Sequence, residues 1–345
     1  MEGPSSNPPG IRLFSTCPPS TDLGRRTYLH TVRDIARWSE DAGCDGILVY
    51  SDNRLVDPWI VSQSILDVTS RLMPLVAVQP LYLHPFTAAK AIASFAYLYE
   101  RRLCINMVAG GFRNDLISLD DETPHDERYD RLIEYVLLMQ ELMAGLGPVT
   151  FQGRYYRVKN LRLTPSLPVE LQPDFFVSGS SSAGLDAARV VGATAVKYPG
   201  PSSSELDVLR EPIPCGIRVG VIARETGEEA WRVAHERFPP DRKGQIAHSM
   251  AMTVSDSEWH GQLSSMGRAE ADAHPYWLTP FENYKTFCPY LVGSYRSVAH
   301  ELGRYLALGY TTVIIDVPAS RDELDHIRVA MEMAEDTDAE VDPTR

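Results

Sequence analysis

The chain has 345 residues, of which 44% are hydrophobic and 23% charged, and this composition is typical of a globular protein with a large buried core. Its net charge of −13 argues against nucleic acid and against an anionic membrane surface as partners. The five cysteines are scattered and form no CxxC pair, so the sequence predicts neither a disulfide framework nor a metal site.

The two ends of the chain lack regular apolar spacing. Residues 1–10 are rich in Pro and Ser and residues 336–345 are acidic, so both are predicted to be disordered. We expect one domain over residues 11–335. Since the first residues lack the pattern of a signal peptide and no window is apolar enough to span a membrane, a cytoplasmic location is expected.

Short apolar runs alternate with amphipathic stretches along most of the chain. The runs read as buried strands are Ile11–Phe14, Gly46–Tyr50, Pro74–Val78, Leu103–Val108, Asp174–Val177, Ala193–Lys197, Gly216–Ile222 and Thr312–Val317. The stretches read as helices are Thr27–Ala42, Pro58–Ser70, Thr87–Tyr99, Asp126–Met143, Ala183–Val191, Glu228–Phe238 and Arg321–Met333. This alternation is typical of the α/β class and of a parallel sheet covered by helices. Eight such units predict a closed (β/α)8 TIM barrel.

Two segments interrupt the alternation. Residues 149–163 (VTFQGRYYRVKNLRL) predict a β-hairpin that turns at Gln152–Gly153 and is inserted after the fourth helix. Residues 239–290 form a long insertion between the seventh and eighth strands. An excursion of this length inside a compact domain is usually functional or mobile.

The carboxyl ends of the strands are where a barrel of this kind builds its active site. Those ends predict the candidate positions Thr16–Cys17, Ser51–Asp52, Gln79–His84, Asn106–Gly111, Ser178–Ser182, Lys197–Tyr198 and Arg218–Gly220. The Ser178–Ser182 segment runs directly into a helix, and a helix start with hydroxyls and a glycine is a ready anion site. The alternative is that one of these serines only caps the helix.

Six segments in the same order resemble the bacterial luciferase-like flavin monooxygenases, and most closely the alkanesulfonate monooxygenase branch. They are INMVAGGFRNDL (105–116), HDERYDRLIEY (125–135), VTFQGRYYRVKNLRL (149–163), FFVSGSSSAGLDAA (175–188), GIRVGVIARETGEEAWRVA (216–234) and LVGSYRSVAHELGRYLALGYTTVII (291–315). The resemblance covers about residues 11–335 and includes the hairpin insertion.

The resemblance implies a barrel that takes reduced FMN (FMNH2) from a separate NAD(P)H:flavin reductase and reacts it with O2 to form a flavin C4a-peroxide. It also implies a homodimer or homotetramer. The positions that match the family's flavin contacts are Ser51, Asn106, His125, Tyr129, Gly179, Ser180 and Ser181. Ser180 and Ser181 match the phosphate ligands. His125 and Tyr129 lie one turn apart and match phosphate-side ligands. Taken alone, His125 would be better read as a helix residue that pairs with Asp126 or Glu122.

The sequence departs from the sulfonate-processing pattern at most of its polar positions. The expected groups are replaced by Cys17, Leu55, Gly220 and Val317, and an expected arginine has no counterpart in residues 279–290. Arg218 is kept. Because a buried anion needs paired donors, we expect the flavin chemistry to persist on an organic substrate other than a simple alkanesulfonate.

Two residues are predicted to be catalytic. Arg218 is expected to stabilise the anionic peroxide or the substrate. His84, at a strand end, could act as a base or orient the peroxide, or could be a hydrogen-bonded histidine that precedes Pro85.

The connection between Tyr198 and Cys215 is too short for a long helix, and the resulting opening near Arg218 would admit a bulky or carrier-tethered substrate. The sequence therefore predicts a two-component, FMNH2-dependent monooxygenase. Two alternatives remain, namely a deazaflavin-dependent oxidoreductase of the same superfamily and a non-catalytic flavin-binding paralogue.

Overall fold

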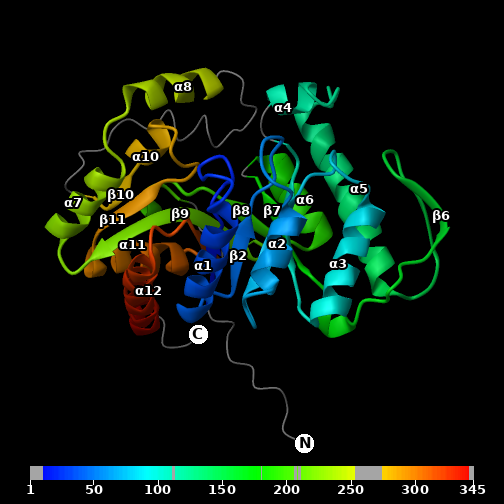
Figure 1. Cartoon of the computed structure of the whole chain (residues 1–345), viewed down its shortest axis with the longest axis horizontal. Helices are drawn as coiled ribbons and strands as arrows, with labels where there is room; N and C mark the ends of the chain where they lie inside the picture. The colour runs from blue at the N-terminus through cyan, green and yellow to red at the C-terminus, as the bar shows by residue number, and fades with distance from the viewer. Residues whose placement is uncertain are drawn as a thin grey trace, which may run out of the picture.

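Parallel strands close into a barrel in the computed structural model, which describes residues 11–110, 113–179, 181–205, 208, 211–252 and 274–341. The barrel strands are β1 (Arg12–Thr16), β2 (Gly46–Val49), β3 (Met73–Val78), β4 (Cys104–Val108), β7 (Asp174–Ser178), β8 (Thr194–Lys197), β9 (Cys215–Arg224) and β12 (Tyr310–Ile315). Each strand pairs in parallel with the next, and β12 pairs with both β9 and β1. The predicted (β/α)8 fold is thereby confirmed (Figure 1).

Helices surround this sheet, with their apolar stripes turned toward the strands. They are α1 (Tyr28–Asp41), α2 (Pro58–Leu66), α3 (Pro85–Tyr99), α4 (Arg113–Ile117), α5 (His125–Ala144), α6 (Ser182–Val191), α7 (Gly227–Arg237), α11 (Tyr295–Ala307) and α12 (Arg321–Val341). In α1, for example, the buried residues Val32, Ile35, Ala36 and Ser39 recur at helical spacing.

Helix α12 corrects one sequence expectation, because it continues through residues 336–341, where a disordered tail was predicted. The predicted disorder of residues 1–10 and 342–345 concerns positions outside the described residues. None of the described helices is long and apolar enough to cross a lipid bilayer.

A layer of inward-pointing side chains fills the barrel. Its members come from seven of the eight strands and are Phe14, Leu48, Leu75, Cys104, Phe176, Val196 and Ile314. The rings of Phe14 and Phe176 meet edge to face, with centroids 5.5 Å apart. This packed layer closes the barrel from below, so any binding site must lie above it, at the carboxyl ends of the strands.

The first insertion is a hairpin of β5 (Val149–Gln152) and β6 (Arg157–Leu161) that follows α5, as predicted. The turn lies one position later than expected. Gln152 still pairs with Arg157, and the amide of Gly153 donates to the carbonyl of Tyr156 at 2.9 Å, so residues 153–156 form the turn. The carboxylate of Glu134 accepts hydrogen bonds from the next three backbone amides, which fixes this longer turn against α5.

The second insertion is anchored to the outside of the barrel. It contains α8 (Arg242–Met252), β10 (Tyr276–Trp277) and α10 (Thr279–Glu282), and residues 253–273 lie outside the described part of the chain. Strand β11 (Tyr290–Ser294) then pairs in parallel with the upper half of β9, over Gly220–Arg224. The sequence prediction includes neither β11 nor α11.

Between β8 and β9 the only helix of the described residues is the single turn η2 (Ser202–Ser204), in keeping with the short connection expected there.

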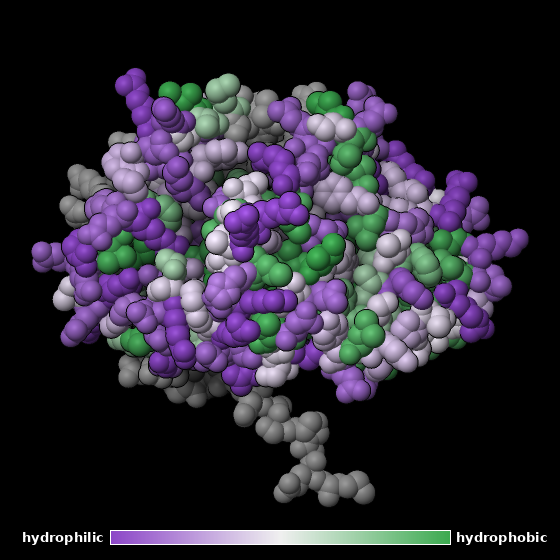
Figure 2. Space-filling model, in the orientation of Figure 1, coloured by the Kyte–Doolittle hydropathy of each residue, from purple (hydrophilic) through white to green (hydrophobic). Residues whose placement is uncertain are grey.

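On the other side of the barrel, Figure 2 shows hydrophobic surface over α2 and α3. Ile60, Tyr97 and Leu98, on these two helices, are 62%, 73% and 71% exposed.

Candidate functional site

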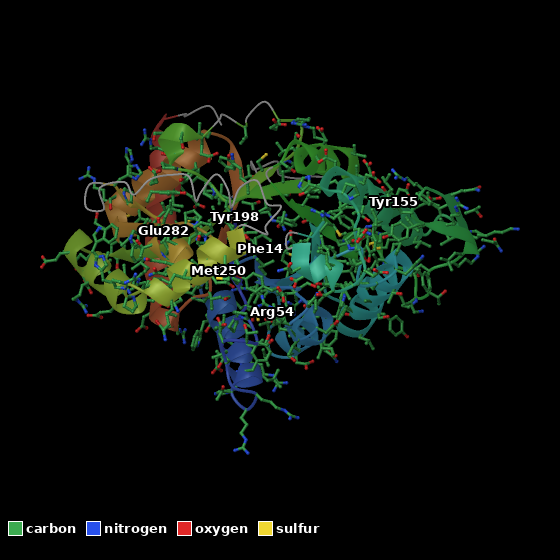
Figure 3. All side chains as sticks on the ribbon, turned by 90° about the horizontal axis from the view of Figure 1, so that it is seen from above. Phe14, Arg54, Tyr155, Tyr198, Met250 and Glu282 are labelled. Atoms are coloured by element: carbon green, nitrogen blue, oxygen red, sulfur yellow. The ribbon has the colours of Figure 1, made fainter. Side chains whose placement is uncertain are left out.

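A cavity of about 870 Å³ opens at the carboxyl ends of the barrel strands. Its floor includes Leu48, Val196 and Ile314 of the packed interior layer. In the view from above, Tyr198 and Phe14 lie near the middle of the molecule and Tyr155 of the hairpin turn lies to the right of them (Figure 3). Of the predicted site residues, the structure brings to the cavity wall Ser51, Asn106, His125, Tyr129, Gly179, Ser181 and Arg218.

One end of the cavity is the start of α6. Ser181 precedes the helix, is 4% exposed, and its Oγ accepts a hydrogen bond from the amide of Gly184 at 3.2 Å. The helix starts at the cavity wall and is ten residues long, so its unpaired amides and dipole favour an anion. Ser181 therefore caps the helix and also lines the cavity, and its part in binding an anion stays a prediction. Ser180 is outside the described residues.

Two glycines let a phenol approach this helix start. A Cβ added to Gly179 would lie 2.4 Å from the hydroxyl of Tyr129, and one added to Gly184 would lie 3.3 Å from the same oxygen. Any larger side chain at Gly179 would therefore displace the Tyr129 hydroxyl. Because a phenol O–H can donate to an anion, these residues form a cradle of hydroxyls and amides.

The start of α5 borders the same cradle. His125 and Tyr129 are one turn apart on α5, and their rings meet edge to face at 5.2 Å. The Nδ1 atom of His125 lies 2.7 Å from a carboxylate oxygen of Asp126, which is the pairing that the sequence left open. His125 also lines the cavity, so the pairing and a ligand contact are compatible.

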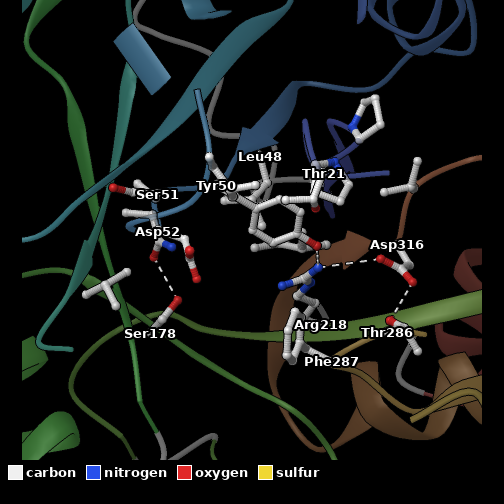
Figure 4. Close-up of a pocket in the computed structure, with 18 of the residues that line it drawn as sticks. Thr21, Leu48, Tyr50, Ser51, Asp52, Ser178, Arg218, Thr286, Phe287 and Asp316 are labelled. Atoms are coloured by element: carbon white, nitrogen blue, oxygen red, sulfur yellow. Dashed lines mark hydrogen bonds and ion pairs between the residues drawn. The ribbon is translucent and has the colours of Figure 1, made fainter. Parts of the chain in front are cut away.

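The wall between the two ends carries Asn106, which is 5% exposed on β4. Its Oδ1 accepts a hydrogen bond from the Oγ of Ser178 at 2.8 Å (Figure 4), which fixes the amide orientation. The described residues offer its Nδ2 no partner, so this N–H donor remains for a ligand. Ser51 also lies on this wall, and its backbone carbonyl accepts a hydrogen bond from Nε2 of Gln79 at 3.3 Å.

Arg218 forms the opposite wall and is 4% exposed on β9. Its Nη1 donates to the hydroxyl of Tyr198 at 3.0 Å, its Nη2 donates to the hydroxyl of Tyr50, and both rings lie against the guanidinium. Nη2 also lies 3.5 Å from Oδ1 of Asp316, just beyond β12 (Figure 4). The Nε atom is buried and has no partner among the described residues.

Asp316 is held in turn by two hydroxyls. Its Oδ2 accepts from Oγ1 of Thr286 at 2.6 Å and from the hydroxyl of Tyr290 at 2.9 Å. Burial raises the pKa of the phenols of Tyr198 and Tyr290 far above the usual value, so both stay protonated. The sequence prediction did not include Asp316, Tyr50, Thr286 or Tyr290 as site residues.

His84 does not lie among the residues that line the cavity. It is exposed and caps α3, where its Nδ1 accepts a hydrogen bond from the amide of Phe86 at 3.1 Å. Its ring also contacts the edge of Tyr156, at 5.8 Å between centroids. This placement matches the second of the two interpretations, a hydrogen-bonded histidine before Pro85.

The mouth of the cavity is polar. Asp52 accepts hydrogen bonds from the backbone and the Nε of Arg54, at 2.8 and 3.3 Å. Burial raises the pKa of the nearby Asp115, and the charge of Asp52 raises it further.

Comparison with known proteins agrees with this geometry. Residues 11–312 match the family described as luciferase-like monooxygenase. The chain is 36% identical over 311 residues to 4-(gamma-L-glutamylamino)butanoyl-(BtrI acyl-carrier protein) monooxygenase BtrO of Niallia circulans, and the match covers 88% of this chain and 91% of BtrO.

Solved structures share the fold at low identity. EDTA monooxygenase EmoA from Chelativorans sp. BNC1 superposes with a TM-score of 0.75 at 17% identity, over 95% of this chain and 94% of EmoA. The riboflavin lyase RcaE with modified FMN gives 0.68 at 17%, over 92% and 90% of the two chains. An F420-dependent secondary alcohol dehydrogenase with an F420–acetone adduct gives 0.65 at 14%, over 94% and 99%. On the family match and the similarity to BtrO, the chain belongs to the luciferase-like monooxygenases.

Proposed function

We propose that this protein is a two-component monooxygenase that uses reduced FMN and O2 to oxygenate an organic substrate. The observation that carries the proposal is one continuous cavity with an anion cradle at the start of α6 and a buried arginine on the opposite wall. A phosphate-bearing cofactor and a substrate would need these two different ends at once.

The residues present fit the phosphate of FMN. A dianion is well served by a helix start, the hydroxyls of Ser181 and Tyr129, and the imidazole of His125. The absence of a side chain at Gly179 leaves the space in which these groups approach one another. The fixed amide of Asn106 would meet the ring system, and Ser180 stays a predicted phosphate ligand.

Bound reduced FMN would supply the two electrons that the reaction needs, so that one atom of O2 enters the substrate and the other is reduced to water. The chain's own residues bind, orient and exclude water. The packed layer below the cavity keeps bulk water from the barrel side, and the half-buried ring of Phe287 lines the cavity near Arg218 (Figure 4). The remaining N–H of the Arg218 Nη1 would hold the substrate at the far end.

We further propose that the substrate is an acyl group tethered to a carrier protein. The similarity to BtrO supports this, because BtrO's name gives an acyl-carrier-protein substrate. The short η2 connection beside Tyr198 supports it as well, since a long helix there would narrow access to Arg218. We expect a separate NAD(P)H:flavin reductase to supply the reduced cofactor.

The second candidate is a deazaflavin-dependent oxidoreductase, which the likeness to the F420-dependent dehydrogenase favours. The two are separated by anaerobic titration of the purified protein with reduced FMN and, in parallel, with reduced F420. We expect reduced FMN to bind more tightly, and we expect FMN-loaded protein mixed with O2 and a carrier-tethered acyl substrate to yield a product heavier by one oxygen atom.

Tighter binding of reduced F420 would overturn the FMN assignment. Tight FMN binding without oxygenation of any acyl substrate would favour the non-catalytic flavin-binding paralogue instead. Tyr129→Phe serves as the site variant, because it removes one cradle hydroxyl. Tyr155→Phe, on the distant hairpin, is its matched control.

A further inference from the structure

Arg218 has fewer free donors than its position suggests. A guanidinium carries five N–H groups. Three of them are directed at the hydroxyl of Tyr198, the hydroxyl of Tyr50 and the carboxylate of Asp316. The Nε atom is buried and has no partner among the described residues, so the donor that remains for a ligand is the second N–H of Nη1.

Asp316 accepts from every one of its described partners. Thr286 and Tyr290 donate to one of its oxygens, and Arg218 faces the other. A carboxyl group that only accepts hydrogen bonds is ionised. The charge of Arg218 is therefore balanced at 3.5 Å by a carboxylate whose side chain is 11% exposed, in a pocket where solvent screens little.

This arrangement is built by a strand outside the barrel. In the pairing of β11 with β9, Tyr290 stands opposite Gly220, and a Cβ on Gly220 would lie 2.3 Å from the ring of Tyr290. Because Gly220 has no side chain, the ring of Tyr290 can occupy this space and its hydroxyl can reach Asp316. Gly220, Tyr290 and Asp316 act as one unit that keeps Arg218 paired.

Two further cations line this part of the cavity. They are Lys285, whose Nζ pairs with Asp241 at 2.7 Å, and Arg237. The Nη2 of Arg237 donates to the carbonyl of Val317 at 2.7 Å, and its guanidinium lies over the rings of Phe238 and Tyr290. Arg237 is only partly buried.

We infer that the Arg218–Asp316 pair recognises a neutral oxygen acceptor of the substrate, such as an amide or a thioester carbonyl, and discriminates against sulfonates and carboxylates. The remaining N–H of Nη1, in a charge-balanced pair, can donate to one carbonyl oxygen. An anion would bring an uncompensated negative charge beside Asp316. The inference deepens the proposed function, on which it rests for the presence of a substrate in this cavity.

The test compares hexanamide with hexanoate, which have the same shape and differ in charge. Their binding to the purified protein is measured by calorimetry without flavin, so the result does not depend on oxygenation. We expect wild-type protein to bind hexanamide through Arg218, so that Arg218→Gln weakens it. In Asp316→Asn the preference should shift at least tenfold toward hexanoate.

Matched variants assign the shift. The double variant Asp316→Asn with Arg218→Gln should abolish the shift toward hexanoate, and Asp316→Asn with Arg237→Gln should keep it. Hexanoate that binds at the α6 cradle instead should bind equally in all of these variants and can be subtracted. Arg218→Gln alone leaves Asp316 uncompensated and should bind hexylammonium at least tenfold better than wild type. This second variant tests the same charge balance if Asp316→Asn does not fold.

Three results would overturn the inference. They are an unchanged preference in folded Asp316→Asn, a wild-type preference for hexanoate that Arg218→Gln removes, and no measurable binding of hexanamide to wild type. Loss of FMN binding, in contrast, would count against the proposed function alone.

Discussion

Ser181 and Ser294 cap their helices in the same way, but only Ser181 lies at the large cavity. Each Oγ accepts a hydrogen bond from the amide three residues later, at 3.2 Å in both cases. Ser294 begins α11 on the outside of the barrel, away from the residues that line the cavity. The pair therefore separates the structural part of a serine cap from its part in ligand binding.

We predict that Ser181→Ala and Ser294→Ala each lower the free energy of unfolding by about 1 kcal/mol, because each removes one helix cap. Ser181→Ala alone should also weaken binding of reduced FMN by about tenfold, since a hydrogen bond to a charged group is lost. Urea unfolding and anaerobic flavin titration measure the two effects. Equal FMN affinity in the two variants would limit Ser181 to capping.

His84 gives a second prediction at this scale. Because it is exposed, caps α3 and lies off the cavity wall, His84→Ala should cost about 1 kcal/mol of stability and leave kcat and KM unchanged. Steady-state oxygenation by His84→Ala and by the cap-preserving His84→Asn measures this. A fall in kcat for both variants would restore the sequence hypothesis of a base or a peroxide-orienting group.

Single residues also mark the limit of the sequence analysis. Arg218, Asn106, Tyr129 and Ser181 could be predicted because they follow strands or match a family motif. Asp316 could not, because one aspartate after the last strand resembles any loop aspartate. Its role depends on the register of β11 on β9, which no spacing within the sequence encodes.

At the scale of elements, β9 explains why a strand was missed. It is ten residues long, and its lower half pairs with β8 and β12 while its upper half pairs with β11. Periodicity predicted the buried strand but not its excess length above the barrel. Because eight strands already complete the predicted barrel, β11 was not predicted as a further strand, although Tyr290–Val292 is an apolar run.

The end of β9 is joined to the start of α12 by a buried ion pair. The Nη1 and Nη2 atoms of Arg224 donate to the two carboxylate oxygens of Glu323, at 3.1 and 2.9 Å, and the two side chains are 10% and 5% exposed. We predict that Glu323→Gln lowers the free energy of unfolding by about 3 kcal/mol, because it leaves a buried charge unpaired.

Glu332→Gln is the control, since the exposed Arg328–Glu332 pair should contribute no more than about 0.5 kcal/mol. Urea unfolding of both variants measures the difference. Equal effects of the two substitutions would show that water solvates the charge of Arg224 when the carboxylate of Glu323 is removed.

At the scale of the whole molecule, three of the exposed apolar side chains lie on two adjacent helices. Ile60 on α2 and Tyr97 and Leu98 on α3 lie on neighbouring helices, which are held together by the stacked rings of Trp59 and Phe95. Large apolar groups gathered on one face of a soluble protein commonly mark a contact with another protein. This face is where we place the contact of the predicted homodimer or homotetramer.

We predict that Tyr97→Glu with Leu98→Glu dissociates the oligomer, because a subunit contact cannot bury two carboxylates without partners. Sedimentation velocity gives the mass in solution, and circular dichroism confirms that the variant is folded. Leu146→Glu is the matched control, since Leu146 is 96% exposed and lies beyond the end of α5. A wild-type protein that sediments as a monomer would refute the oligomer itself, whereas an intact oligomer in the double variant would place the contact on another face. Because the cavity opens at the carboxyl ends of the strands and α2 and α3 flank the barrel, a contact on this face leaves the mouth open to a carrier-bound substrate.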